Sequence, residues 1–193
     1  MSITVVFFLL AIVLGLLVFL RAYQAKLQQE ELRTIAEKSG GSFTPDVEVI
    51  AGKKLHEIPI LDAWEKPKAS NMITIEHDEY TAHFFYYAHS LSQYPQLGNP
   101  QTPVALFKCS GKKFPRIQIE TGKADTAGMV DTEKVIEVAL AHPLMQHSRI
   151  SLKSDGMWLF LEQKKRLKMP MLNWIEHSDH LAHQLIDALP SSS

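Results

Sequence analysis

Histidine is the residue type that most strongly suggests chemistry in this sequence. The chain contains nine histidines, and some of them recur at intervals of three positions near the C-terminus: His177, His180 and His183. In a helix, successive members of this set lie about 300° apart, so the three rings do not converge on one metal ion. Metal-binding helices more often carry the H-E-x-x-H arrangement, which is absent from the sequence. We interpret these histidines as solvent-facing or partly buried side chains.

A second set of histidines and carboxylates surrounds a predicted turn near the middle of the chain. His77 and Asp78 lie in this turn, and His83 and His89 follow along the next predicted strand. Such side chains serve as metal ligands and general bases. An extended strand, however, places His83 and His89 roughly 20 Å apart. These four residues are our candidates for a metal or catalytic site, against the simpler interpretation that the histidine-bearing strand face is sheet surface.

Cys109 is the single cysteine, so the chain cannot form an intramolecular disulfide and suits a reducing compartment. Lys108, Lys112 and Lys113 lie nearby in sequence, and ammonium groups favour a thiolate. No cysteine-centred catalytic signature surrounds it, and G-x-S-x-G, G-x-G-x-x-G and C-x-x-C motifs are also absent. We therefore predict no catalytic residue and no cofactor, and we favour a role other than that of an enzyme.

The first element that the sequence predicts is an apolar segment, Ile3 to Leu20, that carries no charge. At about 1.5 Å per residue, this segment is long enough as a helix to cross most of the roughly 30 Å hydrocarbon core of a bilayer. A cleaved signal peptide is the alternative, but it would have basic residues before the apolar run and small residues after it. Here Arg21 and Lys26 follow instead. We predict that residues 1–22 are a transmembrane anchor and that residues 3–20 contact lipid.

The distribution of basic residues predicts the orientation of this anchor. Arg21, Lys26, Arg33 and Lys38 all lie on its C-terminal side. The positive-inside rule then keeps the domain in the cytoplasm and the N-terminus outside, as in a single-pass protein of a bacterial inner (cytoplasmic) membrane. Arg21, Tyr23 and Lys26 are expected at the membrane interface. The formal net charge of −1 argues against a nucleic-acid partner.

The remaining sequence predicts an α+β fold, with mostly antiparallel strands and two or three packed helices. A juxtamembrane helix occupies 23–40, a cytosolic domain 41–190 and a short tail 191–193. Alternation and β-branched or aromatic residues predict the strands 72–77, 80–88, 104–109, 116–120, 149–154 and 157–163. Asp155-Gly156 is a strong hairpin signal, and helices are expected at 132–142 and 173–189. The domain is either one unit or two lobes, about 41–122 and 128–190.

The order of several short motifs resembles a family of uncharacterised bacterial proteins with one membrane anchor and one cytosolic domain. The matching pieces begin at Ile35-Ala-Glu-Lys-Ser-Gly-Gly-Ser-Phe43 and continue through Leu55-His-Glu-Ile-Pro-Ile-Leu61, Asn71-Met-Ile73, Phe84-Phe-Tyr-Tyr87, Gln101-Thr-Pro-Val-Ala-Leu-Phe107 and Phe114-Pro-Arg-Ile117. The family usually has a glycine between the paired strands, where this chain has His77-Asp-Glu79. The resemblance implies a layout and no chemistry.

Three possible roles follow from these features. We favour a non-catalytic, membrane-tethered module that binds an unidentified protein. The first alternative is a membrane-associated hydrolase or metalloenzyme that uses histidines of the 77–89 segment. The second is a domain that senses anionic lipid through the basic run Lys164-Lys-Arg-Leu-Lys168, since each such charge contributes about 1 kcal/mol near an anionic surface.

Overall fold

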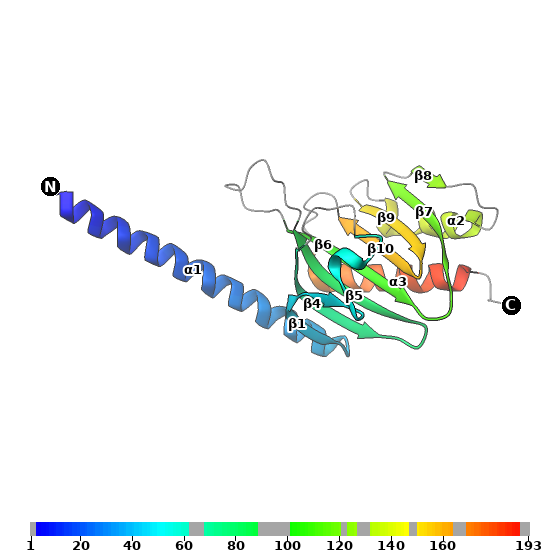
Figure 1. Ribbon diagram of the computed structural model, residues 1–193, viewed down its shortest axis with the longest axis horizontal. Coiled ribbons are helices and arrows are strands. Elements are labelled where there is room, and N and C mark those ends of the chain that lie inside the picture. The colour runs from blue at the N-terminus through cyan, green and yellow to red at the C-terminus, as the bar shows by residue number, and fades with distance from the viewer. Residues whose placement is uncertain are drawn as a thin grey trace.

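The computed structural model describes residues 3–61, 68–88, 101–120, 123–126, 132–146, 150–163 and 169–189. Its first element, α1 (Ile3–Lys38), is one continuous helix that projects far from the rest of the chain (Figure 1). Good helix formers such as Leu, Ala, Gln, Glu and Lys fill its polar half, so nothing interrupts it after the apolar segment. The predicted span and juxtamembrane helix are therefore a single rod.

Two glycines end this rod and turn the chain into the sheet. Gly40 has a φ of 70°, the left-handed conformation that commonly closes helices. The amide of Gly41 donates a 2.8 Å hydrogen bond back to the carbonyl of Ala36. The chain then enters β1 (Ser42–Val47) directly. The glycine stop was predicted from the sequence, whereas β1 was not.

Within the described residues, eight strands form one sheet with the order β1-β4-β5-β6-β10-β9-β7-β8, and every neighbouring pair is antiparallel. The strands after β1 are β4 (Lys68–Glu76), β5 (Tyr80–Ala88), β6 (Gln101–Cys109), β7 (Phe114–Glu120), β8 (Lys123–Thr126), β9 (Ile150–Gly156) and β10 (Trp158–Gln163). β1 lies at the edge of the sheet, which is where a strand tolerates a proline such as Pro45.

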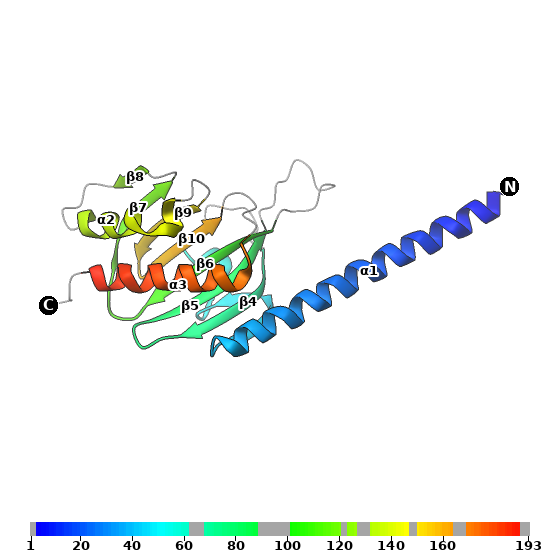
Figure 2. The same cartoon turned by 180° about the vertical axis from the view of Figure 1, so that it is seen from behind.

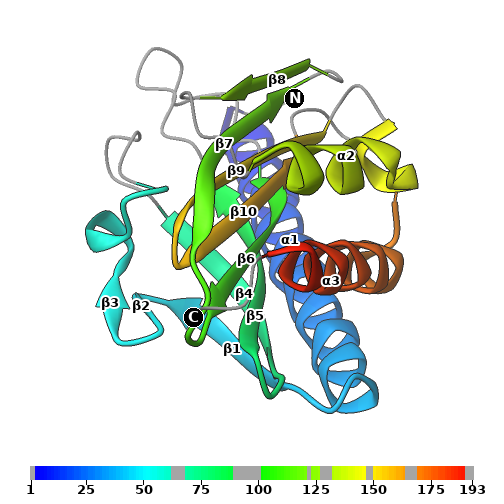
Figure 3. The same cartoon turned by 90° about the vertical axis from the view of Figure 1, so that its right-hand side faces the viewer.

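Helices cover one face of the sheet. They are α2 (Glu133–Ala141), the short 3₁₀ segment η4 (Pro143–Gln146), α3 (Met171–Ala188) and the end of α1 (Figures 2 and 3). Leu32 and Ala36 of α1 are buried there. This layer and the strand residues beneath it, such as Phe84 and Phe107, form the larger of two apolar clusters. Trp174 of α3 is the largest fully buried side chain in the described residues.

The opposite face of the sheet is also covered, by the segment from Val47 to Leu61. It contains the small hairpin of β2 (Val49–Ile50) and β3 (Lys53–Lys54) and the 3₁₀ turn η1 (Leu55–Glu57), on the far side of the sheet from α3 (Figure 3). Ile50, Ile58 and Leu61 pack there against strand residues that include Phe85 and Tyr87. The interpretation of the histidine-bearing face of β5 as sheet surface was therefore wrong, because residues 47–61 bury it.

The predicted α+β class, with an N-terminal apolar helix and antiparallel strands packed by helices, is confirmed. The turn between β9 and β10 lies one residue later than expected: Asp155 pairs with Trp158, and Gly156, with a φ of 56°, begins the turn. The strands of residues 41–122 and those of residues 128–190 share one sheet, because β10 pairs with β6 and β9 pairs with β7. The division into lobes and the exact domain boundaries stay predictions.

Candidate functional site between helices α2 and α3

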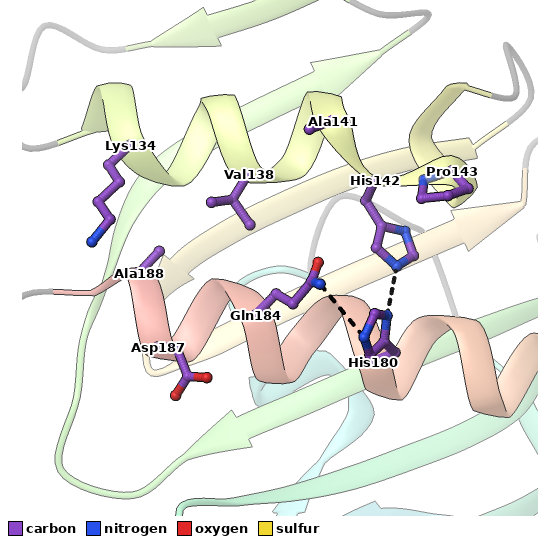
Figure 4. A pocket seen from close by; sticks show the side chains of 9 residues that line it. All are labelled: Lys134, Val138, Ala141, His142, Pro143, His180, Gln184, Asp187 and Ala188. Carbon is purple, nitrogen blue, oxygen red and sulfur yellow. Dashed lines mark hydrogen bonds between the residues drawn. The ribbon is translucent and has the colours of Figure 1, made fainter.

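A cleft of about 490 Å³ separates α2 from α3, and we call it the α2–α3 cleft. Its size lies in the range of small-molecule sites. Figure 4 shows the side chains that line the cleft, some of which are apolar and some polar. The lining residues are Lys134, Val138, Ala141, His142, Pro143, His180, Gln184, Asp187 and Ala188.

A chain of hydrogen bonds crosses one end of the cleft. The backbone amide of Leu144 donates to Nδ1 of His142 over 3.2 Å. Nε2 of His142 lies 3.2 Å from Nδ1 of His180, and Nε2 of His180 lies 3.5 Å from the side-chain amide of Gln184 (Figure 4). Each ring therefore has a neighbour at both nitrogens.

The amide of Leu144 fixes the protons along this chain. Because Nδ1 of His142 accepts that hydrogen bond, the neutral ring carries its proton on Nε2 and donates it to His180. Burial, and then the nearby rings of His180 and His177, lower the pKa of His142. His142 is therefore neutral, and the lone pair of its Nδ1 accepts the hydrogen bond from Leu144.

This arrangement does not suit a metal ion. A metal would need the lone pair of His142 Nε2, which carries the proton in the observed geometry. Among the residues that the structure describes, no group of three or more His, Cys, Asp or Glu side chains could hold a metal ion. The contact between His142 and His180 instead links the end of α2 to the middle of α3.

A second polar group lies where the β4–β5 turn meets α3, and we call it the Asp179 cluster. Asp179 Oδ1 accepts a 3.0 Å hydrogen bond from the hydroxyl of Tyr80 and lies 3.1 Å from Nε2 of His77. The rings of His77 and Tyr80 stack with centroids 4.4 Å apart. Burial, followed by the Asp179 carboxylate, raises the pKa of Tyr80, so the phenol stays a proton donor. This is the reverse of what an activated nucleophile needs.

A lysine and the lone thiol complete the surroundings of this turn. Nζ of Lys112 lies 3.5 Å from Glu79 and donates a 3.2 Å hydrogen bond to the carbonyl of Ile186, near the end of α3. Cys109 is buried, and burial raises the pKa of its thiol to about 12 although Lys112 opposes the shift. The thiolate suggested by the neighbouring lysines is therefore not favoured.

The structure places the predicted site residues on different sides of the sheet. His77 meets Asp179 on the helical face, whereas His83 is buried and contacts the hydroxyl of Thr74 at 3.1 Å. Asp78 is exposed, and His89 lies outside the described residues. None of the described contacts joins His77 to His83.

The histidines of α3 also separate, as their spacing predicted. His180 enters the α2–α3 cleft, whereas His183 is exposed and lies 3.6 Å from Asp187, one turn along the helix. At the other end of the chain, Arg21, Tyr23 and Lys26 are exposed on α1. The basic run at 164–168 lies outside the described residues.

Sequence reasoning missed the partners that matter in both groups. His142 meets a residue 38 positions away, and Tyr80 meets one 99 positions away. No local pattern encodes such pairs, because they depend on which helix packs beside which strand. The only signal in the sequence was the position of His142 at the end of the predicted helix 132–142, directly before Pro143.

Comparisons with known proteins add one likeness of fold. No protein-family model matches the sequence, and no curated protein matches it either. Among solved structures, the crystal structure of the mycobacterial trehalose monomycolate transport factor A, TtfA, aligns with a TM-score of 0.53 at 9% identity. The alignment covers 86% of this chain and 97% of that chain. At this identity the comparison shows a shared fold.

Proposed function

We propose that this chain is a single-pass protein of the bacterial inner membrane whose cytoplasmic α+β domain is a non-catalytic module that binds another protein. The observation that carries the proposal is the continuity of α1 from its apolar end to the sheet. Within the described residues, α1 is the one helix long and apolar enough to cross a membrane, and 0% of its most apolar window is buried. Apolar surface of this kind needs lipid or a partner to cover it.

The same helix fixes the domain in relation to the membrane. Leu32 and Ala36 of α1 are buried against the sheet, and the side chain of Gln28 hydrogen-bonds Tyr86 of β5. Between Leu20 and Leu32 the helix rises about 18 Å. A helix holds this distance far better than a flexible linker would. A helical tether of this kind keeps the domain at a constant distance from the membrane and in one orientation, which suits a module that binds partners at the membrane.

The fold shared with TtfA supports an accessory role rather than catalysis. That protein is a transport factor for trehalose monomycolate, as its name states. In the α2–α3 cleft burial lowers the pKa of His142, and in the Asp179 cluster burial raises the pKa of Tyr80, so neither of these two side chains readily exchanges a proton near neutral pH. We therefore prefer an accessory module to the hydrolase or metalloenzyme alternative.

The orientation is tested by labelling thiols in intact spheroplasts. Cys109 is buried, so an added cysteine dominates the reaction with a membrane-impermeant maleimide. We expect Ser2→Cys to react from outside and Ser192→Cys to react only after the membrane is opened, because the basic residues follow α1's apolar segment. The reverse pattern would place the domain outside the cytoplasm.

The module role is tested by affinity purification of the full-length protein from its native membrane, followed by mass spectrometry. We expect a reproducible protein partner. The Ala25→Pro variant should remain in the membrane yet recover several-fold less partner, because proline breaks the helix between span and domain. Gln24→Ala, which preserves the helix, is the matched control and should behave as the unchanged chain.

Two outcomes would contradict this proposal. Failure to recover any partner above background in several detergents would remove the module role. A stoichiometric metal in the same preparation, lost in the His83→Ala variant, would favour the metalloenzyme alternative instead.

A further inference from the structure

We infer that two copies of this chain pair side by side through α1, in parallel, along a stripe formed by Leu20, Tyr23 and Leu27. The inference rests on the membrane anchoring in the proposed function and goes beyond it. It names a second copy of the chain as the occupant of an apolar stripe that the protein itself leaves uncovered.

The stripe is apolar, exposed and regularly spaced. Leu20, Tyr23 and Leu27 are 44%, 53% and 47% exposed, in a stretch where the other residues are polar or alanine. Their spacing of three and then four positions is that of the a and d positions of a coiled coil. Continued toward the N-terminus, it passes through Leu16 and Val13, so the seam runs unbroken into the apolar segment.

The domain does not compete for this stripe. Glu31 lies near Tyr86 of β5, and the α1 residues that pack on the sheet or hydrogen-bond β5 are Gln28, Leu32, Ile35 and Ala36. At 100° per residue, their mean direction lies roughly 130° around the helix from that of the stripe. Two helices can therefore meet along the stripe while each domain stays on the outer side of the pair.

Charge complementarity favours a second copy in parallel over another occupant. With Leu20 and Leu27 at a positions and Tyr23 at d, Lys26 occupies position g and Glu31 the following e. In a parallel pair these two positions face each other across the seam, so Lys26 of each copy meets Glu31 of the other, twice by symmetry. Glu30 takes the next d position, where the two like charges oppose the pairing, so Leu27 is the last apolar position of the seam.

Disulfide trapping in the native membrane tests this pairing. The unchanged chain supplies a low background because Cys109 is 1% exposed. We expect full-length Leu27→Cys to form a covalent dimer under mild oxidation at least fivefold more than Gln29→Cys. Gln29 is exposed at nearly the same height but on the other side of the helix.

A charge exchange separates specific pairing from simple crowding. In the Leu27→Cys background, Lys26→Glu should reduce the yield of dimer several-fold, because it sets two carboxylates against each other. Adding Glu31→Lys should restore the yield. Restoration is not expected if the cysteines meet by random collision in the membrane.

Each other outcome overturns the pairing in a recognisable way. Equal yields at positions 27 and 29 would show collision, and no dimer at 27 would show that lipid covers the stripe. An adduct of a different mass would show that another protein covers it. An alkaline wash of the same membranes reports anchoring separately, since a chain released by the wash contradicts the proposed function as well.

Discussion

Gly41→Ala is expected to lower the free energy of unfolding by about 3 kcal/mol, because added volume in a packed site forces backbone to move. A Cβ at Gly41 would lie 2.5 Å from the backbone carbonyl oxygen of Thr74 and 3.0 Å from Cγ1 of Ile75. Both atoms belong to β4, which is held between β1 and β5 and cannot withdraw easily. Chemical denaturation of the full-length protein in detergent, followed by tryptophan fluorescence, measures the loss.

Gly40→Ala is the matched control for this prediction. Gly40 has a positive φ, but a Cβ there meets nothing within 4 Å. Its replacement should therefore cost only the strain of a left-handed alanine, about 1 kcal/mol. Equal losses for the two variants would show that backbone conformation, rather than the close approach of α1's end to β4, makes these glycines necessary.

Gly41 illustrates which part of the fold the sequence could predict. The pair of glycines after a long polar helix predicts a helix end, and that end is observed. The packing of Gly41 against Thr74 was not predictable, because it follows from β1 pairing with β4 across a long sequence separation. Pro45 also hid β1, since a proline argues against a strand unless the strand lies at an edge.

The same contrast holds for the two faces of β5. Alternation correctly separated Tyr80, Ala82 and Phe84 from Phe85 and Tyr87, and the two groups lie in different apolar clusters. Periodicity says which residues share a face, but it does not say what covers that face. The cover of the second face comes from residues 47–61, whose short irregular elements carry little periodic signal.

The candidate site was the least predictable feature for a related reason. Local spacing drew attention to the histidines of α3, yet only His180 enters the cleft, and its partner His142 comes from another helix end. The chemistry of a pair of this kind depends on the amide of Leu144, which fixes the proton on His142. No residue-type pattern encodes that backbone contact.

Acidification is expected to destabilise the domain, chiefly through His83. This side chain is 4% exposed, its Nε2 has no hydrogen-bond partner, and burial and then Lys108 lower its pKa to about 4. In the unfolded chain the pKa is about 6.5. Stability is therefore fully present above pH of about 6.5 and is lost as the pH falls toward 4, because protons then bind the unfolded chain more tightly.

The size of this effect follows from the two pKa values. Between pH 7.5 and pH 5.0, His83 should remove about 2 kcal/mol of unfolding free energy, and about 3 kcal/mol once the pH falls below 4. Denaturant titrations at the two pH values measure the difference. Lys108 on neighbouring β6 adds to the cost, since it would face the new imidazolium charge.

His83→Asn isolates the contribution of this ring. Asparagine places a polar atom near the position of Nδ1, so it can keep the contact with Thr74 without titrating. The variant should be less stable at pH 7.5 because it leaves a cavity, but its stability should fall about 2 kcal/mol less on acidification. His142, whose pKa is also lowered, titrates equally in both proteins and cancels from the comparison. An identical loss in the two proteins would mean that His83 accepts a proton in the folded state without penalty, and that water reaches this side chain.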